Sequence, residues 1–495
     1  MSPLDAVMLA VAVLVPWMAG AAVLAALPGV RVEAAGRPAW IAGAGWLLGA
    51  FILTLVMRGL ARIGVPFGRL AIALPLLAIA AAALYLAWRR AGWPSRDLWI
   101  AGRDALSGRA LDRPARLAWL ALLAWLALRF AMLLAEVLWQ PLYPWDAWIQ
   151  WATKAKVWYS LRTIVPFEFA EQWFAANGAR YFDASPHYPA TVPLWQVWTS
   201  TMLGRWDDAL MNVFWWQCAV ALALVAYAAL RRFGYGRLGA LVGTWLLSSL
   251  PLANVHVALA GYADLPMAAY FTVAAVAALR WLDRRGSDDA LLALTFVAAC
   301  PLIKTPGIIW AMTILAAVVV GAWPRGGLRL VGLSAAALAV VLTIASRYHP
   351  TILGYTLHLS FAPAWSGLGD AFFILGSWHL LWYAVIAVAI LGRREAAEPP
   401  LLPFTILIAA GAAFLLAVFG VTNARDWVAD QTTVNRAALH LAPLAALWTL
   451  AVFRRYAMRA GPDDASSAAG ASAAAGGQPL PAEPAADPAV QPAHG

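Results

Sequence analysis

The sequence predicts an all-α, polytopic membrane protein with about 13 transmembrane helices and further interfacial helices in one large outer loop. Hydrophobic residues make up 63% of the 495 residues and charged residues only 12%, whereas a soluble domain is roughly half apolar and a quarter charged. The apolar runs are ~17–23 residues long, which suits helices that cross about 30 Å of hydrocarbon. They do not alternate between apolar and polar residues as the strands of a membrane β-barrel do.

Apolar spans follow one another along most of the chain. The stretch from Met1 to Leu27 lacks a basic n-region, so we expect a retained helix rather than a cleaved signal peptide. The chain divides into N-terminal transmembrane helices (1–138), an outer loop (139–208), a helix bundle (209–455) and a tail (456–495). The tail is rich in Ala, Pro, Gly and Ser, which predicts a disordered cytoplasmic segment. The spans are predicted at residues 5–27, 39–57, 69–88, 116–138, 209–230, 238–255, 265–281, 289–303, 307–322, 328–346, 371–391, 401–421 and 437–453.

Arginine placement predicts the orientation in the membrane. Short loops rich in Lys and Arg stay in the cytoplasm, and most Arg-rich loops here alternate correctly along the chain. We therefore expect 139–208, 256–264, 347–370 and 422–436 outside, facing the periplasm if the protein lies in a bacterial inner (plasma) membrane. Arg58, Arg62 and Arg69 break the pattern, which leaves the side of the N-terminus open. The predicted cytoplasmic arginines are Arg89, Arg90, Arg96, Arg103, Arg109, Arg113, Arg116, Arg231, Arg232, Arg237, Arg280, Arg284, Arg285, Arg325, Arg329, Arg393, Arg394, Arg454, Arg455 and Arg459.

Charge and cysteine content exclude other classes of protein. The net charge of +10 comes from the loops between spans, and no basic stripe lies outside them, so no nucleic-acid partner is expected. Cys218 and Cys300 both lie inside apolar runs, which implies neither a disulfide framework nor a thiolate metal site. The sequence contains no glycine-rich phosphate loop, zinc-ligand spacing or nucleophile elbow.

The outer loop, residues 139–208, is too long for a simple connector and is dense in Trp, Tyr and Phe. Disordered segments are poor in aromatic residues, so we expect the loop to be folded. Because Trp and Tyr favour the headgroup level, short helices on the outer membrane surface are predicted. The stretch from Val192 to Leu203 is apolar but too short to span the membrane.

Asp146 is the first candidate for chemistry. It lies among Trp residues just after the fourth span, and desolvation there raises a carboxyl pKa toward the range of a general base. The alternative is an N-cap of an interfacial helix. If a helix follows, Gln150 and Lys154 lie at i+4 and i+8 on the face of Asp146. These residues then form a polar stripe of acid, amide and cation.

Two candidates precede or begin structured segments. His187 lies between Pro186 and Pro189, which fix an extended segment and hold the imidazole in place. Its alternative role is a surface histidine in a turn. Asp264 follows Gly261 and precedes an apolar run, so it is either a functional carboxylate or an N-cap at the positive end of a helix.

Two cations begin or interrupt spans on the outer side. Lys304 lies between two short spans and needs a partner or water at that depth. A lipid phosphate is one candidate partner, and a snorkelling anchor is the alternative. Arg436 begins the last span; it suits bidentate phosphate binding or an ordinary ion pair with Asp426 or Asp430. We predict that Lys304 and Arg436 converge with Asp146 on one outward-facing cavity.

These motifs occur in a characteristic order. Trp145-Asp146-Ala147 follows a span, and Lys154-Ala155-Lys156 and His187-Tyr188-Pro189 come next; Gly261-Tyr262-Ala263-Asp264-Leu265-Pro266 then opens a helix, and Lys304 sits between paired spans. The order resembles the GT-C superfamily of polyprenyl-phosphate-dependent membrane glycosyltransferases. The closest likeness is to its bacterial membrane branch, with Rgt-type lipopolysaccharide glycosyltransferases, protein O-mannosyltransferases and the aminoarabinose lipid A transferase. It covers roughly Trp139 to Trp310, with a weaker echo at Asn435-Arg436.

The resemblance implies roles for individual residues. Asp146 matches the aspartate that serves as general base, Asp264 a second outer aspartate, and Lys304 a recurring lysine. His187 and Tyr188 match the segment before an interfacial helix, and aromatic rings such as Tyr188 suit the apolar faces of sugars. In the family, the catalytic aspartate is often followed by glutamate. Here Ala147 follows it, which puts a divalent metal in doubt and implies no other cofactor.

The implied activity is inverting transfer of a sugar from a polyprenyl-phosphate donor to a lipid, polysaccharide or protein acceptor on the outer face of the inner membrane. Membrane lipids are the other expected partners. An O-antigen ligase- or polymerase-like enzyme is the near alternative, since such enzymes also use outer loops and lipid-linked donors, but they typically rely on Arg and His rather than on an early Asp. A transporter is the distant alternative and requires ionisable residues near the bilayer midplane and internal repeats. Neither feature is expected here, because the polar residues cluster at one face.

Overall fold

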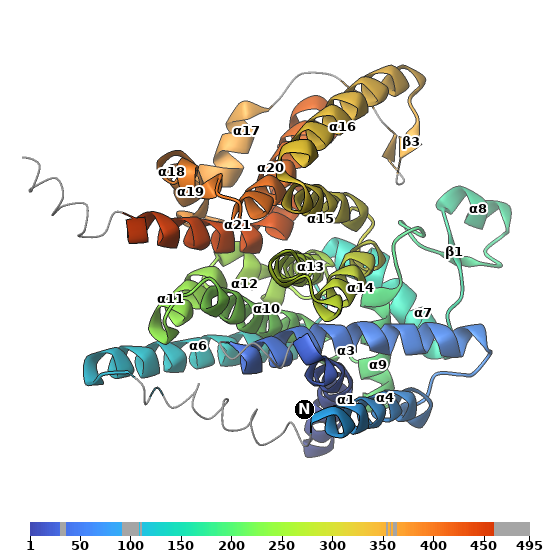
Figure 1. Cartoon of the computed structure of the whole chain (residues 1–495). Coiled ribbons are helices and arrows are strands. Elements are labelled where there is room, and N and C mark those ends of the chain that lie inside the picture. Colours follow the sequence, from blue (N-terminus) through green and yellow to red (C-terminus); the bar gives the residue numbers. More distant parts are fainter. Residues whose placement is uncertain are drawn as a thin grey trace, which may run out of the picture.

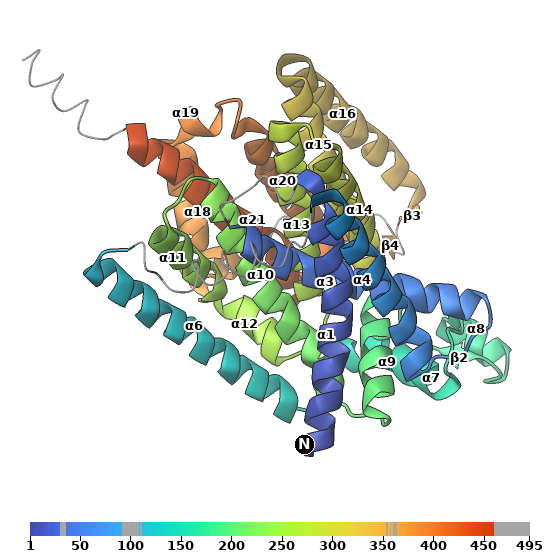
Figure 2. The ribbon, with the colours of Figure 1, turned by 60° about the horizontal axis from the view of Figure 1, so that its bottom comes forward.

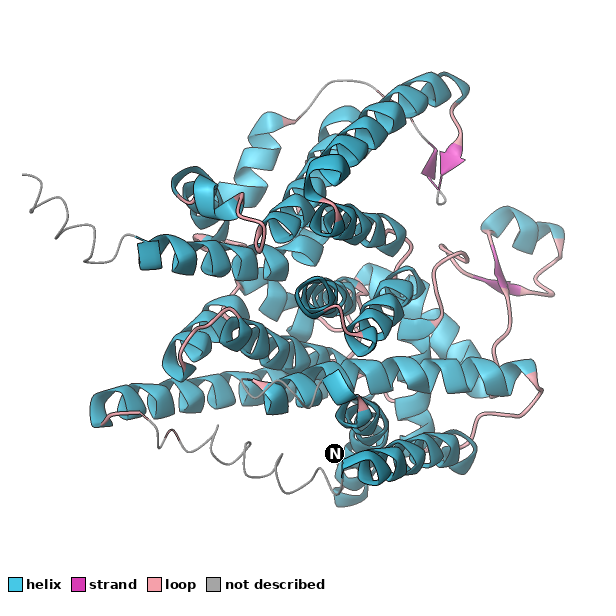
Figure 3. Cartoon of the chain, viewed as in Figure 1, coloured by secondary structure: helices cyan, strands magenta, loops and turns pink. Residues whose placement is uncertain are grey.

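The computed structural model describes residues 1–29, 36–91, 108, 111–352, 355–356, 358–359 and 364–459. Helices dominate these ranges (Figure 3). The strands described are two residues long each: β1 (Phe167–Glu168) pairs parallel with β2 (Tyr181–Phe182), and β3 (Thr351–Ile352) pairs antiparallel with β4 (Tyr355–Thr356). The predicted all-α class is therefore confirmed.

Nine helices in the described ranges are long and apolar enough to cross a membrane (Figure 1). Because so many helices of this kind occur in one chain, it is a multi-pass membrane protein. The helices are α1 (Pro3–Ala26), α3 (Arg37–Arg62), α4 (Arg69–Ala91), α6 (Arg113–Trp139), α10 (Val213–Arg232), α13 (Asp264–Arg284), α16 (Pro324–Ala345), α20 (Leu402–Val421) and α21 (Thr432–Arg459).

The predicted count of 13 spans is not confirmed. The predicted span 238–255 is two helices, α11 (Arg237–Ser248) and α12 (Pro251–Ala258), bent by 64°. Pro251 explains the break, because proline disfavours helical backbone in the residue before it. The predicted span 371–391 is also interrupted, since the short π-helix η4 (Asp370–Ile374) is separated from α18 (Leu381–Leu391) by Gly376 and His379, both with positive φ.

Two further predicted spans are helices but fall short of the length of a full crossing. They are α14 (Ser287–Ile303), with 17 residues, and α15 (Gly307–Ala322), with 16. A Cβ on Gly307 would lie 2.2 Å from the carbonyl oxygen of Cys300, so this glycine allows α15 to begin directly against the end of α14. The pair encloses Lys304 at its turn.

Short elements fill the outer loop and the connections. The outer loop is folded, as predicted, and α21 continues to Arg459, so the segment predicted as a tail begins in a helix; residues 460–495 lie outside the described residues. The short elements are η1 (Ala147–Ala152), α7 (Thr153–Leu161), α8 (Ala170–Ala175), α9 (Thr191–Leu203), η2 (Leu210–Asn212), η3 (Ser346–Tyr348), α17 (Trp365–Gly369), α19 (Arg393–Ala396) and η5 (Asn423–Trp427).

Helix α9 is packed into the bundle, so for this helix the prediction of a position on the outer surface is wrong. All of its side chains except that of Thr201 are buried by protein. The indole of Trp195 donates to the carbonyl of Ala50 in α3 (3.0 Å), and that of Trp198 donates to the carbonyl of Ala12 in α1 (2.8 Å). Figure 2 shows α9 beside α1. Burial of two Trp rings with satisfied N–H groups outweighs an interfacial position.

Helices α1 and α3 cross closely through glycine. A Cβ on Gly20 would lie 2.0 Å from the carbonyl oxygen of Gly45, and one on Gly49 would lie 1.8 Å from that of Pro16. Gly45 and Gly49 are four residues apart and so share one face of α3. Small residues at this spacing let membrane helices pack backbone to backbone.

Contacts with the outer loop show on which side of the bundle the chain begins. Asp5 pairs with Arg205 of the outer loop, Arg58 donates to the Thr191 hydroxyl (2.9 Å), and Arg69 donates to the carbonyl of Thr201 (3.1 Å). Two of the arginines that broke the charge pattern therefore bind the outer loop, and α1 begins on the side of that loop.

The other end of the bundle gathers the predicted cytoplasmic arginines. Arg284 donates to the carbonyl of Gly29 (2.8 Å), just after α1, and Arg454 of α21 donates to the carbonyl of Phe233 (3.0 Å), just after α10. Figure 1 shows the end of α21 opposite α7 and α8. The protein thus has an outer-loop end and an arginine-rich end.

Candidate functional site

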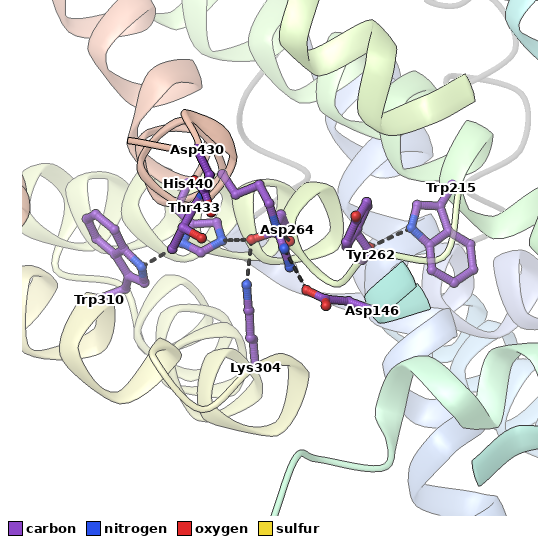
Figure 4. A network of polar contacts seen from close by, with 10 residues as sticks. Asp146, Trp215, Tyr262, Asp264, Lys304, Trp310, Asp430, Thr433 and His440 are labelled. Carbon is purple, nitrogen blue, oxygen red and sulfur yellow. Dashed lines mark hydrogen bonds and ion pairs between the residues drawn. The ribbon is translucent and has the colours of Figure 1, made fainter. Parts of the chain in front are cut away.

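Asp264 is the centre of a buried polar network at the outer-loop end of α13 (Figure 4). Its side chain is 0% exposed. One carboxylate oxygen, Oδ1, accepts from Lys304 Nζ (2.5 Å) and contacts His440 Nε2 (3.0 Å); the other, Oδ2, accepts from Arg436 Nε (3.0 Å). A buried carboxylate stays ionised only when it is paired and hydrogen-bonded in this way.

The groups around Asp264 come from distant segments of the chain. Lys304 lies at the turn between α14 and α15, and its backbone N–H caps α14 by donating to Cys300 O (3.2 Å). Arg436 and His440 are four residues apart on α21 and therefore point to the same side of that helix. His440 was not among the residues predicted from the sequence, although its i+4 spacing from Arg436 was a signal that could have found it.

A second carboxylate joins the network through Arg436. Asp146, directly before η1, accepts from Arg436 Nη1 (2.6 Å), and its side chain is 26% exposed, against 17% for Arg436 and 11% for Lys304. Asp146 is thus the most accessible of the four charged side chains. The guanidinium also lies over the ring of Tyr262, 4.2 Å from its centroid.

Gly261 allows the two carboxylates to approach each other. Its φ is +110°, a conformation that favours glycine, and a Cβ there would lie 2.5 Å from the Cβ of Ala147 and 2.7 Å from Leu142 Cδ1. The loop before α13 therefore packs directly onto the start of η1. This contact sets Asp146 beside the guanidinium that also binds Asp264.

The hydrogen bonds of His440 fix its tautomer. The indole of Trp310 donates to Nδ1 of His440 (2.9 Å). An indole N–H can only donate, so Nδ1 is an acceptor and the proton of the neutral ring is on Nε2. Nε2–H then donates to Asp264 Oδ1. His440 is therefore a donor to the carboxylate, with no nitrogen left to accept a proton from a substrate.

The predicted convergence of Lys304 and Arg436 with Asp146 is confirmed. The snorkelling alternative for Lys304 is wrong, because its ammonium is buried against Asp264. The loop-acid alternative for Arg436 is also wrong, because its partners are Asp146 and Asp264. Instead of lining the predicted open cavity, these side chains fill the space between them with ion pairs.

The N-cap alternatives for the two aspartates do not describe what their side chains do. Asp146 precedes η1 without a capping hydrogen bond, and Asp264 is already the first residue of α13, whose cap is Ala263. Both carboxylates instead accept from side chains of other helices. Tertiary contacts therefore account for their positions.

Lys154 belongs to a second cluster, so the predicted stripe with Asp146 and Gln150 is wrong. Its side chain is 2% exposed; Nζ lies 3.1 Å from Asp183 Oδ1 and donates to the carbonyl of Ser185 (2.7 Å). Gln150 is half-buried, and no contact links it to Asp146 in the part of the chain described. The reason is that η1 is a π-helix, whose wider turn shifts the i+4 and i+8 positions round the axis.

His187 and Tyr188 also lie with the second cluster. Tyr188 stacks on Trp151, with centroids 5.1 Å apart and planes 7° from parallel, and the ammonium of Lys154 lies 6.0 Å from the Tyr188 centroid. His187 is exposed and contacts the rings of Phe169 and Tyr188. The structure therefore does not bring His187 or Tyr188 into the network of Asp264.

Burial opposes charge throughout the second cluster. It lowers the pKa of Lys154 and raises the pKa of Asp183, while the attraction between the two groups acts in the opposite direction. Partial desolvation of its ring by the folded loop, followed by the Lys154 charge, lowers the pKa of His187. These directions of the pKa shifts fit a buried ion pair that holds the folded loop together.

Arg129 is an ionisable residue that was not predicted to matter. It lies inside α6, within the span predicted at 116–138, and donates to Asn254 Oδ1 (3.3 Å) near the break between α11 and α12. Asn254 in turn donates to the carbonyls of Ser248 and Leu250 (3.1 and 2.6 Å). The sequence analysis placed the polar residues at one face of the membrane and did not single out Arg129, although a guanidinium inside a hydrophobic run was a signal that could have found it.

The side chains around Asp146 and Asp264 do not form a suitable set of ligands for a metal ion. Across the described residues, no group of three or more His, Cys, Asp or Glu side chains is arranged to hold a metal. Asp264 already accepts three hydrogen bonds, and His440 Nε2 carries a proton directed at it. The residues present therefore do not fit a divalent cation between Asp146 and Asp264.

Comparison with known proteins gave no match to any family model, curated protein or solved structure.

Proposed function

We propose that this protein is a membrane glycosyltransferase that moves a sugar from a polyprenyl-phosphate donor to an acceptor hydroxyl on the outer face of the membrane, with inversion. The observation that carries the proposal is the arrangement of Asp146, a partly exposed carboxylate, beside the Arg436 guanidinium. Arg436 is in turn held by the buried Asp264, next to the Lys304 ammonium. A base next to two cations suits attack on a sugar whose leaving group is a phosphate.

In the proposed reaction, Asp146 takes the proton of the acceptor hydroxyl. The acceptor oxygen forms a bond to the anomeric carbon of the sugar from the face opposite the phosphate. The bond between that carbon and the phosphate oxygen breaks, and its electron pair stays on the polyprenyl phosphate. The additional negative charge falls where Arg436 and Lys304 provide donors, and fixed donors aimed at developing charge often contribute more to the rate than any other effect.

Arg436 links donor binding to the base. Without substrate, its Nη1 neutralises Asp146 at 2.6 Å. A donor phosphate matches a guanidinium bidentately and so competes with Asp146 for Arg436. When Arg436 turns toward the phosphate, the Asp146 carboxylate is released from its ion pair and is free to accept the proton of the acceptor hydroxyl. Activation of the base then requires the donor to be in place.

Asp264 has a different role in this proposal from the one implied by the resemblance. It is fully buried and accepts from Lys304, Arg436 and His440, so protonating it would break several charge-assisted hydrogen bonds. We assign it as a positioning residue that holds the two cations. His440, kept in the Nε2–H tautomer by Trp310, holds Asp264 in the same way.

The surroundings of Asp146 suit a lipid-linked sugar. Trp145 and Trp148 are 64% and 40% exposed, with centroids 4.8 Å apart in an edge-to-face arrangement. Such rings pack against the apolar faces of sugars and against lipid at the headgroup level. A polyprenyl tail can lie along the apolar helices while its phosphate reaches the cations.

The direct test uses purified protein in lipid nanodiscs with radiolabelled polyprenyl-phosphate sugars and a mixed set of acceptors. The wild type should transfer label, and Asp146→Asn should lower the rate by ~10²–10⁴-fold, the usual loss for a general base. Asp426→Asn is the matched control, because Asp426 in η5 is an exposed acid whose partner is Arg425. Transfer by Asp146→Asn within a few-fold of wild type removes Asp146 from the mechanism.

A second candidate function rests on Arg129. A guanidinium inside α6, bound near the break between α11 and α12, is a feature of transporters, whose sites use broken helices and ionisable residues within the membrane. Uptake of sugar phosphates into proteoliposomes, abolished by Arg129→Leu and unaffected by Asp146→Asn, would favour this candidate. If labelled sugar were transferred only from donors in which the sugar is linked through a diphosphate, the result would favour the ligase-like alternative.

A further inference from the structure

Two carboxylates on different elements face one small space. Asp146 precedes η1, Asp264 begins α13, and the guanidinium of Arg436 lies between them. Nη1 and Nε belong to the same planar group and contact Asp146 Oδ2 at 2.6 Å and Asp264 Oδ2 at 3.0 Å. In many phosphate-transfer sites, a divalent ion bridges oxygens in this manner.

The charges around this space are already balanced. Two carboxylates face two cations, Arg436 and Lys304. A divalent ion added here would leave two uncompensated positive charges next to a buried ammonium, at a large desolvation cost. The tautomer of His440 adds a further obstacle, since its Nε2–H points at Asp264.

The local packing also limits the number of oxygen ligands. The residue after Asp146 is Ala147, which is 0% exposed and packs against Gly261. The start of η1 therefore provides no third carboxylate, and Ca²⁺, which takes about six to eight oxygen ligands, would have to draw most of them from water. The ring of Tyr262, 4.2 Å from the guanidinium, suits a flat cation that stacks.

We infer that Arg436 is a built-in replacement for a divalent cation, so that this site is metal-independent and its two carboxylates bind a guanidinium where other sites bind a metal ion. The catalytic part of this inference rests on the proposed function, but the binding part does not. Arg436 is a covalent part of α21 and is anchored through Nε by Asp264, so the cation cannot be removed by a chelator. The inference therefore predicts binding behaviour that is measurable without any substrate.

The test measures Mn²⁺ binding by electron paramagnetic resonance on the full chain in detergent. Wild type should bind no Mn²⁺ at micromolar concentrations, and EDTA should change neither its unfolding temperature nor any transfer activity. Arg436→Ala vacates the space and leaves a net negative site, so it should gain one Mn²⁺ site. The double variant Arg436→Ala with Asp264→Asn should lose that site again, because one bridging carboxylate is gone.

Two measurements keep the inference falsifiable if Arg436→Ala folds poorly. Arg436→Lys keeps the charge and should gain no Mn²⁺ site, and the wild-type measurement needs no variant at all. Where Arg436→Ala does fold, added guanidinium chloride at millimolar concentration should compete with Mn²⁺ for the vacated space.

Two results would overturn the inference. One is a wild-type Mn²⁺ site that Asp146→Asn or Asp264→Asn removes, and the other is a folded Arg436→Ala variant that binds Mn²⁺ no better than wild type. Failure of sugar transfer with these binding results intact would count against the proposed function alone.

Discussion

Two buried lysine–aspartate pairs lie on the outer-loop side of this protein, and their surroundings differ. Lys154 and Asp183 are both at most 2% exposed, and the remaining bond of the ammonium is to the backbone of Ser185. Lys304 and Asp264 are similarly buried, but Asp264 is also bound by Arg436, which continues to the partly exposed Asp146. The Lys154–Asp183 pair links two parts of the same loop. The Lys304–Asp264 pair instead connects through Arg436 to Asp146, a side chain that a substrate can reach.

The comparison shows that burial of an ion pair does not identify a functional site. Lys154 and Asp183 are 29 residues apart in one loop, so their pairing fixes local chain geometry. The second network joins segments up to 290 residues apart, and such long-range assembly of charges is costly unless every member is paired. What distinguishes the second network is its exposed end at Asp146.

The largest expected difference is between the two lysines. Lys304→Met should lower sugar transfer by ~10²–10³-fold, the usual cost of removing one donor from a developing charge. Lys154→Met should instead destabilise the fold by about 3–5 kcal/mol, because it leaves Asp183 buried without its cation. Initial rates and thermal unfolding of both variants, with Lys304→Arg as a charge-preserving control, provide the measurement. A reversed result would mean that the roles of the two pairs are exchanged.

Gly261→Ala tests whether assembly of the site depends on the contact with Ala147. The new Cβ would lie 2.5 Å from Ala147 Cβ, so Asp146 should move away from Arg436. A displacement of about 1 Å costs ~10²-fold in rate. Gly59→Ala is the control, because a Cβ there meets nothing within 4 Å. Equal rates for the two variants would show that the contact is not needed.

Trp310→Phe should have a smaller effect on the same network. The ring shape persists, but His440 loses the N–H that fixes its tautomer, a loss of about 1 kcal/mol for a neutral hydrogen bond. We expect ~5- to 10-fold lower kcat with little change in KM, since the substrate-binding cations stay paired. The ¹⁵N chemical shift of the His440 Nδ1 atom reports the tautomer directly. An unchanged shift in the variant would remove Trp310 as the residue that sets it.

The smallest expected effect is the pH dependence of stability that arises from His187 in the second cluster. Partial desolvation of its ring, followed by the Lys154 charge, lowers the pKa of His187 from its ordinary value of 6.5. The folded protein therefore binds fewer protons than the unfolded chain between the two values. The contribution of His187 to stability is therefore full above about pH 6.5 and declines as the pH falls toward the lowered value. Thermal unfolding between pH 8 and pH 5 should show a steeper decline for wild type than for His187→Gln. Parallel curves would contradict the shift.

The sequence alone predicted the membrane class, because nothing but lipid suits so apolar a chain and hydrophobic run length measures the crossing. It also predicted that Asp146, Lys304 and Arg436 belong together, since charged residues at the ends of apolar runs must find partners. The sequence predicted continuous spans where the structure has breaks near Pro251 and Gly376. Average hydropathy does not register the backbone conformation of single residues.

Only the tertiary structure decided which carboxylate each cation binds. Asp264, Arg436 and His440 meet because α13 and α21 pack side by side, and no local pattern encodes that pairing. The π-helix after Asp146 turned Lys154 toward Asp183 instead, which the 3.6-residue period did not anticipate. The residue types in a segment determine which groups require partners, and the packing of distant helices determines which partners they find. The reason is that an ion pair forms only when two groups lie within a few ångströms of each other. The separation of two residues in the sequence does not tell whether they lie that close in the folded protein.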